Sequence, residues 1–567
     1  MQFISYSIKI AVFAMFLMPA QEIRAESANL AQSETEIYQL RITELEKYNG
    51  LRIDSVEIDN REIFDTQIEP YNNFIFKTAN KLHIRTRTLV IARELLLKKG
   101  DVFESELAEE ITRNLRNRYV IYDAWIEIEE LDSGDLLMRL VTIDEWSFSG
   151  GLGISREGNE YSYEIGFLEK NFLGLNQSLS FDYVIQEKDD NYIESSFKDI
   201  RFAGQPFRIT VNYSNNPVSS NQAASLSHPF YNLEQAFSFG IVAAKGQNRN
   251  EVFKDSLLIG RSNTADDFLL GFMNYRFGPR KKKVITGLNY TYTFERTNEK
   301  EYFDSGLSDD IDLVNESFPQ DSLYHLVNLS LRGSLLDFKT FRKIDGFGYT
   351  EDFTLGHTAA IGYGRAFNPH FNDHVYDRVL FNYSFGFNVA AELFYFSYTR
   401  VNKFKGTRDF QRVSIVSANY YHTGAEFLTI ALNVDYVNDW RPERTENLIL
   451  GGKSGLRGYP SEFKTGDRLA VLNLEGRLHP EIRIFTTILG FAIFMDAGRV
   501  WKPNELLTTK DFYFSGGVGL RFALDRSSRS RFFRADLAYS QQNKLEISIG
   551  TGQFFNLSNH SLFLTSR

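Results

Sequence analysis

Apolar and polar residues alternate along most of this chain from residue 146 onward. The segments FRITVNYS (207–214), VNLSLR (327–332) and LTIALNVDY (428–436) each place apolar side chains at every second position. Successive side chains of a β-strand point to opposite faces, so this period of two predicts strands with one apolar face and one polar face. Beyond residue 146 the chain is therefore predicted to consist mainly of β-strands.

The alternation continues over roughly 400 residues in runs of about ten, as strands that cross a membrane in a barrel require. Closure of a barrel pairs the backbone N–H and C=O groups, which hydrocarbon cannot hydrate. Allowing about 25 residues for a strand with its connection gives on the order of 16 strands. We therefore predict an all-β transmembrane barrel of about 16 antiparallel strands over residues 146–556. A β-sandwich or propeller in the periplasm is the alternative.

A different pattern precedes the barrel. Residues 52–64 alternate like a strand, and residues 88–97 carry apolar residues at helical spacing. A second helix is predicted where apolar residues recur at every fourth position: Leu107, Ile111 and Leu115. Two strands, 124–131 and 136–143, follow with a turn between them. This order predicts a compact α+β domain over residues 50–145.

The two ends of the chain have their own patterns. Lys9 and the apolar stretch Ala11–Ala20 predict a secretory signal peptide over residues 1–25, cleaved after Ala25. The polar residues 26–49 are predicted to be a linker with at most one short helix. The last strand is predicted at 544–555, followed by a C-terminal tail at 557–567.

Composition narrows the possible functions. Aromatic residues make up 15% of the chain, with 50 Phe and 29 Tyr but 4 Trp, which suits pleated surfaces and membrane-interface girdles. The chain has no Cys, which excludes disulfides, thiolate metal sites and a Cys nucleophile. The net charge of -10 argues against a nucleic-acid binder, which would need a basic patch.

Three charged residues stand among glycines and aromatics in the segments 451–478 and 491–501: Arg457, Glu475 and Asp496. Alternation places Glu475 and Asp496 on the polar faces of their strands. Arginine presents a planar fork that binds carboxylates in a bidentate manner. We therefore predict that Arg457 pairs with the two acids and offsets the ordering entropy of a loop inserted into the barrel.

With these segments in view, the chain resembles the outer-membrane assembly-factor superfamily, which includes the BamA and TamA insertases and the two-partner-secretion transporters. The α+β unit resembles one polypeptide-transport-associated (POTRA) domain, and the chain has room for one such unit. The resemblance implies a motif on a loop inserted into the barrel lumen, preceded by Gly451-Gly452: Leu456, Arg457, Gly458 and Tyr459. It also implies partners on the lumen wall: Glu475, Phe494, Asp496 and Gly498. Arg477, by contrast, is predicted only to line a wet lumen.

This resemblance implies a protein of the outer membrane of a Gram-negative-type bacterium, with the POTRA-like domain in the periplasm. Such a protein inserts or exports β-rich polypeptides: an edge strand of the POTRA pairs with an incoming strand, and the seam between the first and last barrel strands opens. Glycines weaken strand pairing. They stand on both sides of the predicted seam, where barrel curvature is the other interpretation: Gly150, Gly151, Gly153, Gly550 and Gly552.

The competing hypothesis is a gated or passive solute channel, since a barrel of this size can enclose water. An enzyme is not predicted, because the sequence contains no nucleophile elbow, zinc-protease motif or phosphate-binding loop. No cofactor or metal is predicted; His370 and His374 have no third ligand nearby in the sequence. The expected partners are outer-membrane lipid and either unfolded β-rich clients or a secreted partner. Periplasmic and lipoprotein partners stay open.

Overall fold

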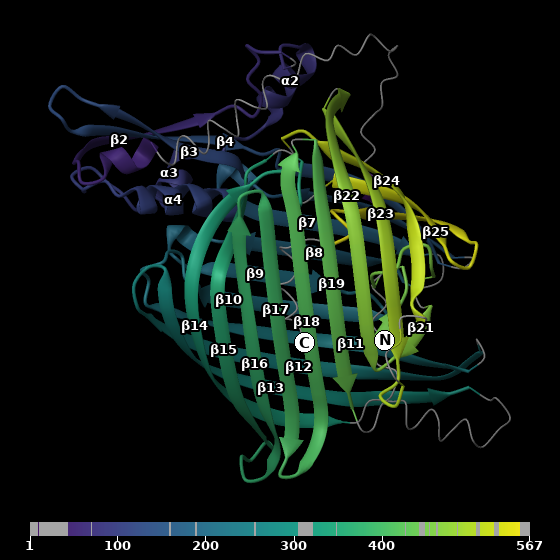
Figure 1. The fold of residues 1–567 in the computed structure, drawn as a ribbon. Coiled ribbons are helices and arrows are strands. Elements are labelled where there is room, and N and C mark those ends of the chain that lie inside the picture. Colours follow the sequence, from purple (N-terminus) through teal and green to yellow (C-terminus); the bar gives the residue numbers. More distant parts are fainter. Residues whose placement is uncertain are drawn as a thin grey trace.

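The computed structural model shows a small α+β domain at one end of a large curved sheet (Figure 1). It describes the residues 9–10, 44–69, 71–157, 160–186, 190–254, 257–303, 321–347, 349–425, 427–441, 448–452, 454–460, 463–484, 486–505, 508, 511–526 and 532–555. Nearly all of the predicted signal peptide, most of the predicted linker and the predicted tail at 557–567 lie outside the described residues.

The α+β domain consists of a three-stranded sheet with helices packed against it. In the sheet, β2 (Ile53–Arg61) runs parallel to the central β4 (Leu136–Asp144), and β3 (Ile121–Glu130) runs antiparallel to it. The helices are η1 (Glu46–Tyr48), α2 (Phe74–Leu82), α3 (Thr88–Ala92) and α4 (Ser105–Arg118). Ile111 and Leu115 of α4 are fully buried in the domain core, so apolar burial holds this helix on the sheet.

Two helices differ from the prediction. The sequence pattern missed α2, because the apolar run that opens it has no helical period and Phe76 is its only buried residue. The side chain of Asn73 caps α2 by accepting hydrogen bonds from the N–H groups of Ile75 and Phe76. The helix predicted over 88–97 ends at Ala92. No helix among the described residues is long and apolar enough to cross a membrane.

Among the residues that the structure describes, the large sheet has 21 strands, one of which, β1 (Lys9–Ile10), has two residues. The others are β5 (Phe148–Glu157), β6 (Glu160–Glu169), β7 (Gln177–Gln186), β8 (Tyr192–Asp199), β9 (Arg208–Ser214), β10 (Ser219–His228), β11 (Phe237–Lys254), β12 (Leu257–Phe277), β13 (Lys282–Tyr302), β14 (Ser322–Phe341), β15 (Glu351–Phe367), β16 (His374–Val389), β17 (Glu392–Lys405), β18 (Arg408–Ala425), β19 (Leu428–Trp440), β22 (Arg468–Ile484), β23 (Thr487–Trp501), β24 (Tyr513–Leu524), β25 (Phe532–Ser540) and β26 (Leu545–Thr551). Each of these strands from β5 to β26 is antiparallel to the next one along the sheet.

The predicted fold class is confirmed: a barrel-like antiparallel sheet follows an N-terminal α+β domain. Alternation assigns the faces, since Leu472 and Leu474 of β22 are exposed on the outside while Asn473 and Glu475 are buried. The predicted number of about 16 strands is too low. The first six strands, β5 to β10, occupy only residues 148–228, so they are spaced more closely than the about 25 residues that the prediction assumed.

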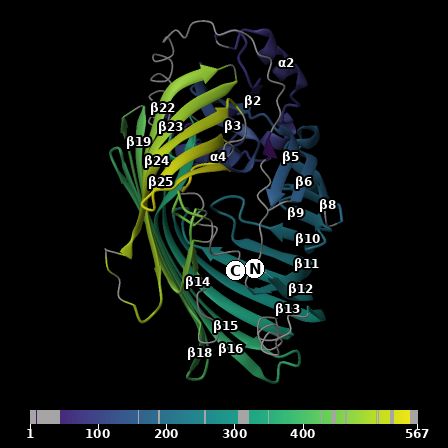
Figure 2. The ribbon, with the colours of Figure 1, turned by 90° about the vertical axis from the view of Figure 1, so that its right-hand side faces the viewer.

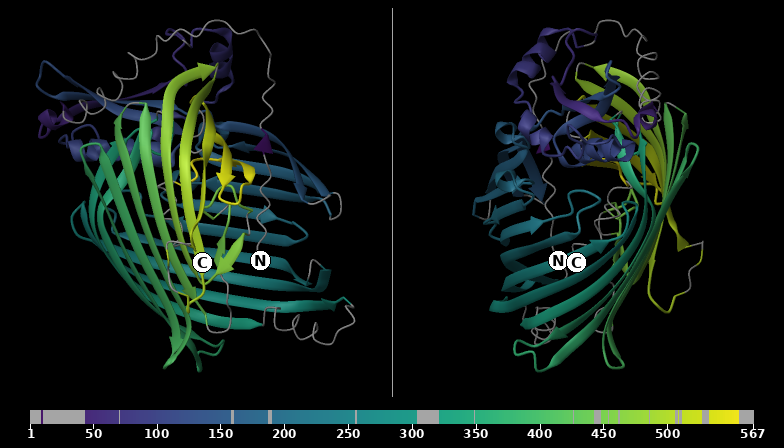
Figure 3. Two further views of the ribbon diagram at one scale, coloured as in Figure 1. Left: turned by 45° about the vertical axis from the view of Figure 1, so that its right-hand side comes forward. Right: turned by 90° about the vertical axis from the view of Figure 1, so that its left-hand side faces the viewer.

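The α+β domain lies across one end of the curved sheet, here called the domain end (Figures 2 and 3). Arg116 of α4 makes a bidentate salt bridge with Asp352 at the start of β15, with nitrogen–oxygen distances of 2.8 and 2.6 Å. Both side chains are only 2% exposed. On the other side of the domain, the hydroxyl of Tyr71 donates a 2.7 Å hydrogen bond to Asp525, which follows β24. Polar contacts therefore fix the domain to strands far apart in the sequence.

The strand order places β26, the last strand of the large sheet, next to β5. The two residues of β1 pair with β5 at Leu152 and Gly153. The strand predicted over 544–555 ends at Thr551, because Gly552 has a φ of +74° and the backbone leaves the extended conformation there.

Candidate functional site

The segment between β19 and β22, here called the inserted loop, folds into the interior of the sheet. Two short strands, β20 (Leu448–Leu450) and β21 (Lys464–Gly466), pair at its base. Leu450 and Leu456 are fully buried, and with Tyr459 they pack on Val471 of β22. Burial of these apolar side chains holds the loop against the inner wall.

Arg457 lies at the centre of the contacts between the inserted loop and the inner wall, and its side chain is fully buried. Its Nε and Nη2 atoms each donate a 2.7 Å hydrogen bond to Asp496 of β23, one to each carboxylate oxygen. Its backbone N–H donates to the same carboxylate at 3.2 Å. This is the bidentate geometry that arginine, unlike lysine, provides.

A second and a third acid complete the surroundings of this guanidinium. Nη1 of Arg457 donates a 2.6 Å hydrogen bond to Glu475 of β22 and lies 3.6 Å from Asp536 of β25. The rings of Phe494 and Phe554 lie 3.5 and 4.1 Å from the guanidinium carbon, so the charged group also contacts two aromatic rings. Burial disfavours the charge of Arg457, but the hydrogen bond to Asp496 and the nearby acids raise its pKa overall.

The structure therefore brings together Arg457, Glu475, Phe494 and Asp496, which the sequence analysis singled out. The other motif residues lie around them. Leu456 and Tyr459 are buried beside Arg457, and the Tyr459 hydroxyl donates a 3.0 Å hydrogen bond to the carbonyl of Phe514. A Cβ atom added to Gly498 would lie 2.7 Å from Leu450, so the wall needs a glycine there for the loop to pack closely. We call Arg457, Glu475, Asp496 and Asp536 the anchor cluster.

Gly458 gives a first prediction, because its φ of +82° is unfavourable for any residue with a side chain. An alanine Cβ there would also lie 3.2 Å from the Cβ of Ala538 and 3.4 Å from that of Ser515. Gly458→Ala is expected to weaken docking of the inserted loop by about 1–3 kcal/mol. Chymotrypsin cleavage at Phe463 is then expected to accelerate by about tenfold or more.

The matched control for this variant is Gly333→Ala in β14, where φ is not positive and an added Cβ meets nothing within 4 Å. Equal cleavage rates in the two variants would show that the backbone conformation of Gly458 does not hold the loop.

The prediction that Arg477 only lines a wet lumen is wrong. Its side chain is 1% exposed, and its Nε donates a 3.0 Å hydrogen bond to Glu475. Its two other nitrogens donate to the carbonyl oxygens of Ile344 and Phe555. Glu475 therefore links Arg457 of the loop to Arg477, which holds a turn and the C-terminal segment.

Sequence reasoning missed three charged residues on β24 and β25: Arg521, Arg534 and Asp536. Arg521 of β24 donates a 2.5 Å hydrogen bond to Asp536, and Arg534 of β25 donates one of 2.7 Å to the same acid. Arg521 also lies 3.7 Å from Glu475. Their positions on the inward face of alternating strands were the signal that could have identified them.

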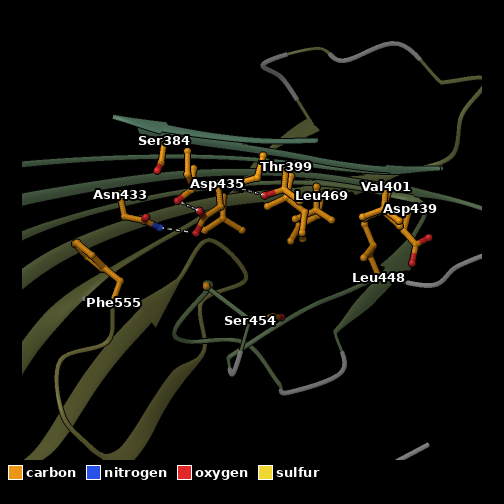
Figure 4. A pocket seen from close by; sticks show the side chains of 18 of the residues that line it. Ser384, Thr399, Val401, Asn433, Asp435, Asp439, Leu448, Ser454, Leu469 and Phe555 are labelled. Carbon is orange, nitrogen blue, oxygen red and sulfur yellow. Dashed lines mark hydrogen bonds between the residues drawn. The ribbon is translucent and has the colours of Figure 1, made fainter. Parts of the chain in front are cut away.

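A large cavity lies inside the curved sheet beside the inserted loop. Its volume is about 2970 Å³, and hydroxyl, amide and charged side chains from many strands line it. Figure 4 shows Asn433, Asp435 and Thr399 on the strand wall, Ser454 of the inserted loop facing them, and Phe555 near Asn433. Asn433 donates a 2.8 Å hydrogen bond to Asp435, so part of the wall is already internally bonded.

The glycines predicted for a seam stand at the two outer strands. Gly150, Gly151 and Gly153 of β5 face Phe167, Gly166 and Glu164 of β6. Gly550 of β26 faces Arg534, while Gly552 lies just beyond the end of that strand.

The histidines considered as metal ligands lie outside the anchor cluster. His374 forms an ion pair of 3.2 Å with Asp377. Among the residues that the structure describes, no group of three His, Asp or Glu side chains is arranged to hold a metal ion.

Three solved structures match this chain over most of its length. BamA from Haemophilus ducreyi, lacking POTRA domains 1–3, matches with a TM-score of 0.37 and 14% identity over 94% of this chain and 95% of that one. CdiB from Acinetobacter baumannii matches with a TM-score of 0.41 and 12% identity over 88% and 73% of the two chains. CdiB from Escherichia coli matches with a TM-score of 0.41 and 12% identity over 94% and 98%.

No protein-family model and no curated protein sequence matches this chain.

Proposed function

We propose that this chain is an outer-membrane protein of the assembly and translocation superfamily, and that it inserts or exports β-rich polypeptides. The observation that carries the proposal is the anchor cluster: a loop inserted in a barrel-like sheet and fixed by Arg457 to Asp496 and Glu475. A pore for small solutes needs no such buried ionic anchor. A barrel that must hold and release a polypeptide needs an interior element with one defined docked position.

Two further features support the handling of polypeptides. The strand order places β26, the last strand of the large sheet, next to β5, and opening of the sheet between these two strands would free backbone groups for pairing with an incoming strand. In the α+β domain, β2 and β3 are the edges of the three-stranded sheet and offer the same chemistry. With the domain end in the periplasm, a client would meet the α+β domain first and the outer strands second.

The apolar outer face of the large sheet supports placement in a membrane. Outward-facing residues of successive strands are large and exposed, among them Leu329, Leu331, Ile361, Ile493 and Met495. Such a band costs free energy in water and gains it in hydrocarbon. Residues 1–25 would then direct export and be removed.

The polar cavity of about 2970 Å³ favours one alternative, a gated or passive solute channel. The two functions predict different results when the protein is depleted from cells. Depletion of a polypeptide-handling barrel is expected to lower specific outer-membrane proteins or one secreted protein, and the purified chain is expected to show small, flickering conductance in planar bilayers.

Quantitative outer-membrane and secreted proteomics after depletion, paired with single-channel recording, makes this test. An unchanged proteome together with a large, steady conductance would refute polypeptide handling and establish a pore.

A further inference from the structure

The C-terminal segment Gln553–Phe555 leaves the sheet and enters its interior. After β26 ends at Thr551, Gly552 turns the chain inward with its φ of +74°. Gln553 and Phe555 are then buried, at 6% and 8% exposed, and all three residues border the large cavity. Two aromatic side chains are thus placed beside the anchor cluster, although they follow the last strand.

Each of the two phenylalanines occupies its own surroundings. The ring of Phe554 lies 4.1 Å from the guanidinium carbon of Arg457 and 4.9 Å from that of Arg534. Phe555 packs into an apolar cluster with Ile344, Phe353, Leu355, Leu393, Tyr421 and Ala431. Phe554 also packs against this cluster, so the inner wall holds two adjacent aromatic side chains, one beside Arg457 and Arg534 and one within the apolar cluster.

The backbone of this segment is also recognised. Nη2 of Arg477 donates a 2.8 Å hydrogen bond to the carbonyl oxygen of Phe555. The guanidinium of Arg477 lies 4.9 Å from the ring of the same residue. Recognition of a main-chain carbonyl does not depend on side-chain identity, so the three contacts together select an extended peptide with two neighbouring aromatic residues.

The contacts that hold the segment can be exchanged for the same contacts with another chain. Gln553–Phe555 belongs to no strand, so its release breaks no ladder of backbone hydrogen bonds. Arg534, Phe554 and Phe555 line the adjoining cavity of about 2970 Å³, so a second extended segment in the cavity would lie beside the C-terminal segment. An identical set of contacts would bind an incoming peptide with no loss of packing in the wall.

We propose that Arg457, Arg477, Arg534 and the apolar cluster around Phe555 form a binding site for an extended peptide with two adjacent aromatic side chains. Phe554 and Phe555 occupy the site at rest, and a polypeptide passing through the protein displaces them. The identification of the natural ligand as a client rests on the proposed function; the binding site itself does not.

Displacement would reach the inserted loop through shared contacts. Phe554 contacts Arg457 directly, while Phe555 contacts Arg477, and both arginines bond Glu475. Arrival of an aromatic peptide would therefore exchange one occupant for another, while the ring of Phe494 stays on the guanidinium of Arg457. This makes the site a means of admitting a client while the anchor cluster stays intact.

The experiment uses the full chain in nanodiscs and a fluorescent peptide with the sequence of residues 544–555. Binding is measured by fluorescence anisotropy to the wild type and to the double variant Phe554→Ala/Phe555→Ala, whose site is vacated. We expect the vacated variant to bind the peptide at least about tenfold more tightly, because the wild-type site is competent only in the fraction of molecules whose segment has left it. The same peptide with alanine in place of both phenylalanines is expected to bind neither protein.

Equal affinity of wild type and vacated variant, or equal binding of the alanine peptide, would overturn the proposal. Phe555→Ala alone keeps Phe554 on Arg457 and provides the same comparison if the double variant does not assemble. Adding Arg477→Ala to the vacated variant is expected to reduce binding at least about tenfold, because the carbonyl donor is lost. Peptide binding with an unchanged proteome after depletion would retain the site and refute the proposed function, whereas the reverse pair of results would refute only the site.

Discussion

Replacing Arg457 with alanine is expected to release the inserted loop and to accelerate its cleavage by chymotrypsin about 100-fold or more. The variant removes the bidentate cation of Asp496, which stays buried with Asn473 as a hydrogen-bond donor, while Glu475 keeps Arg477. Removing one partner of a buried ion pair costs about 3–5 kcal/mol. The cleavage site at Phe463 does not depend on the substituted residue, so the rates can be compared directly.

Two variants separate the geometry of Arg457 from its charge. Arg457→Lys keeps the charge but loses the fork that contacts both carboxylate oxygens of Asp496, so we expect an intermediate cleavage rate. Arg332→Ala is the matched control, because Arg332 lines the same cavity with an exposed side chain. Cleavage of Arg457→Ala at the wild-type rate would show that the apolar contacts of the loop suffice to hold it.

The anchor cluster is better suited to defining one docked position than to adding stability. Transfer of three acids and their arginines out of water costs much of what their mutual attraction returns, and apolar side chains of similar volume could fill the same space. An apolar patch, however, accepts many registers, whereas the bidentate pair of Arg457 and Asp496 accepts one. A loop that must detach and return to the same place benefits from that selectivity.

Local periodicity explains why part of this site could be predicted from the sequence. Glu475 and Asp496 share a strand face with other polar residues, and a period of two decides that face without any knowledge of the fold. The same reasoning applies to Arg521 and Asp536. They were not singled out because no motif marks them, whereas a glycine-rich loop motif marks Arg457.

Features that depend on long-range packing could not be predicted from the sequence. The polar strand face predicted for Arg477 is correct. Its burial, however, depends on Ile344 and Phe555, which lie 133 and 78 residues away in the chain. The inward turn of the C-terminal segment depends on the positive φ of Gly552, which a reading of the alternating pattern passes over. Likewise, the short strands from β5 to β10 raise the strand number because their connections are short, a property of turns and not of strand periodicity.

The second large effect is expected where the α+β domain meets the sheet. Arg116→Ala leaves Asp352 buried without its bidentate partner, whereas Asp352→Ala leaves Arg116 with the Ala124 carbonyl and with Asp123, 3.9 Å away. Arg116→Ala is expected to weaken docking of the domain by about 3–5 kcal/mol and Asp352→Ala by less, and the double variant by less than the sum of the two. Because the chain has no Cys, docking can be followed by maleimide labelling of Thr350→Cys, whose position is 1% exposed beside the domain.

The same interface contains a control pair. Lys281 and Glu106 also connect the sheet to α4, with a nitrogen–oxygen distance of 2.7 Å, but their side chains are 47% and 52% exposed. Water and ions screen such a pair, so Lys281→Ala is expected to change docking by less than about 1 kcal/mol and labelling of residue 350 by less than about tenfold. Arg116→Ala should accelerate that labelling by about 100-fold or more, because labelling follows the undocked population. If both variants label at the same rate, burial of the bridge does not set the strength of docking, and the domain is held by its apolar contacts instead.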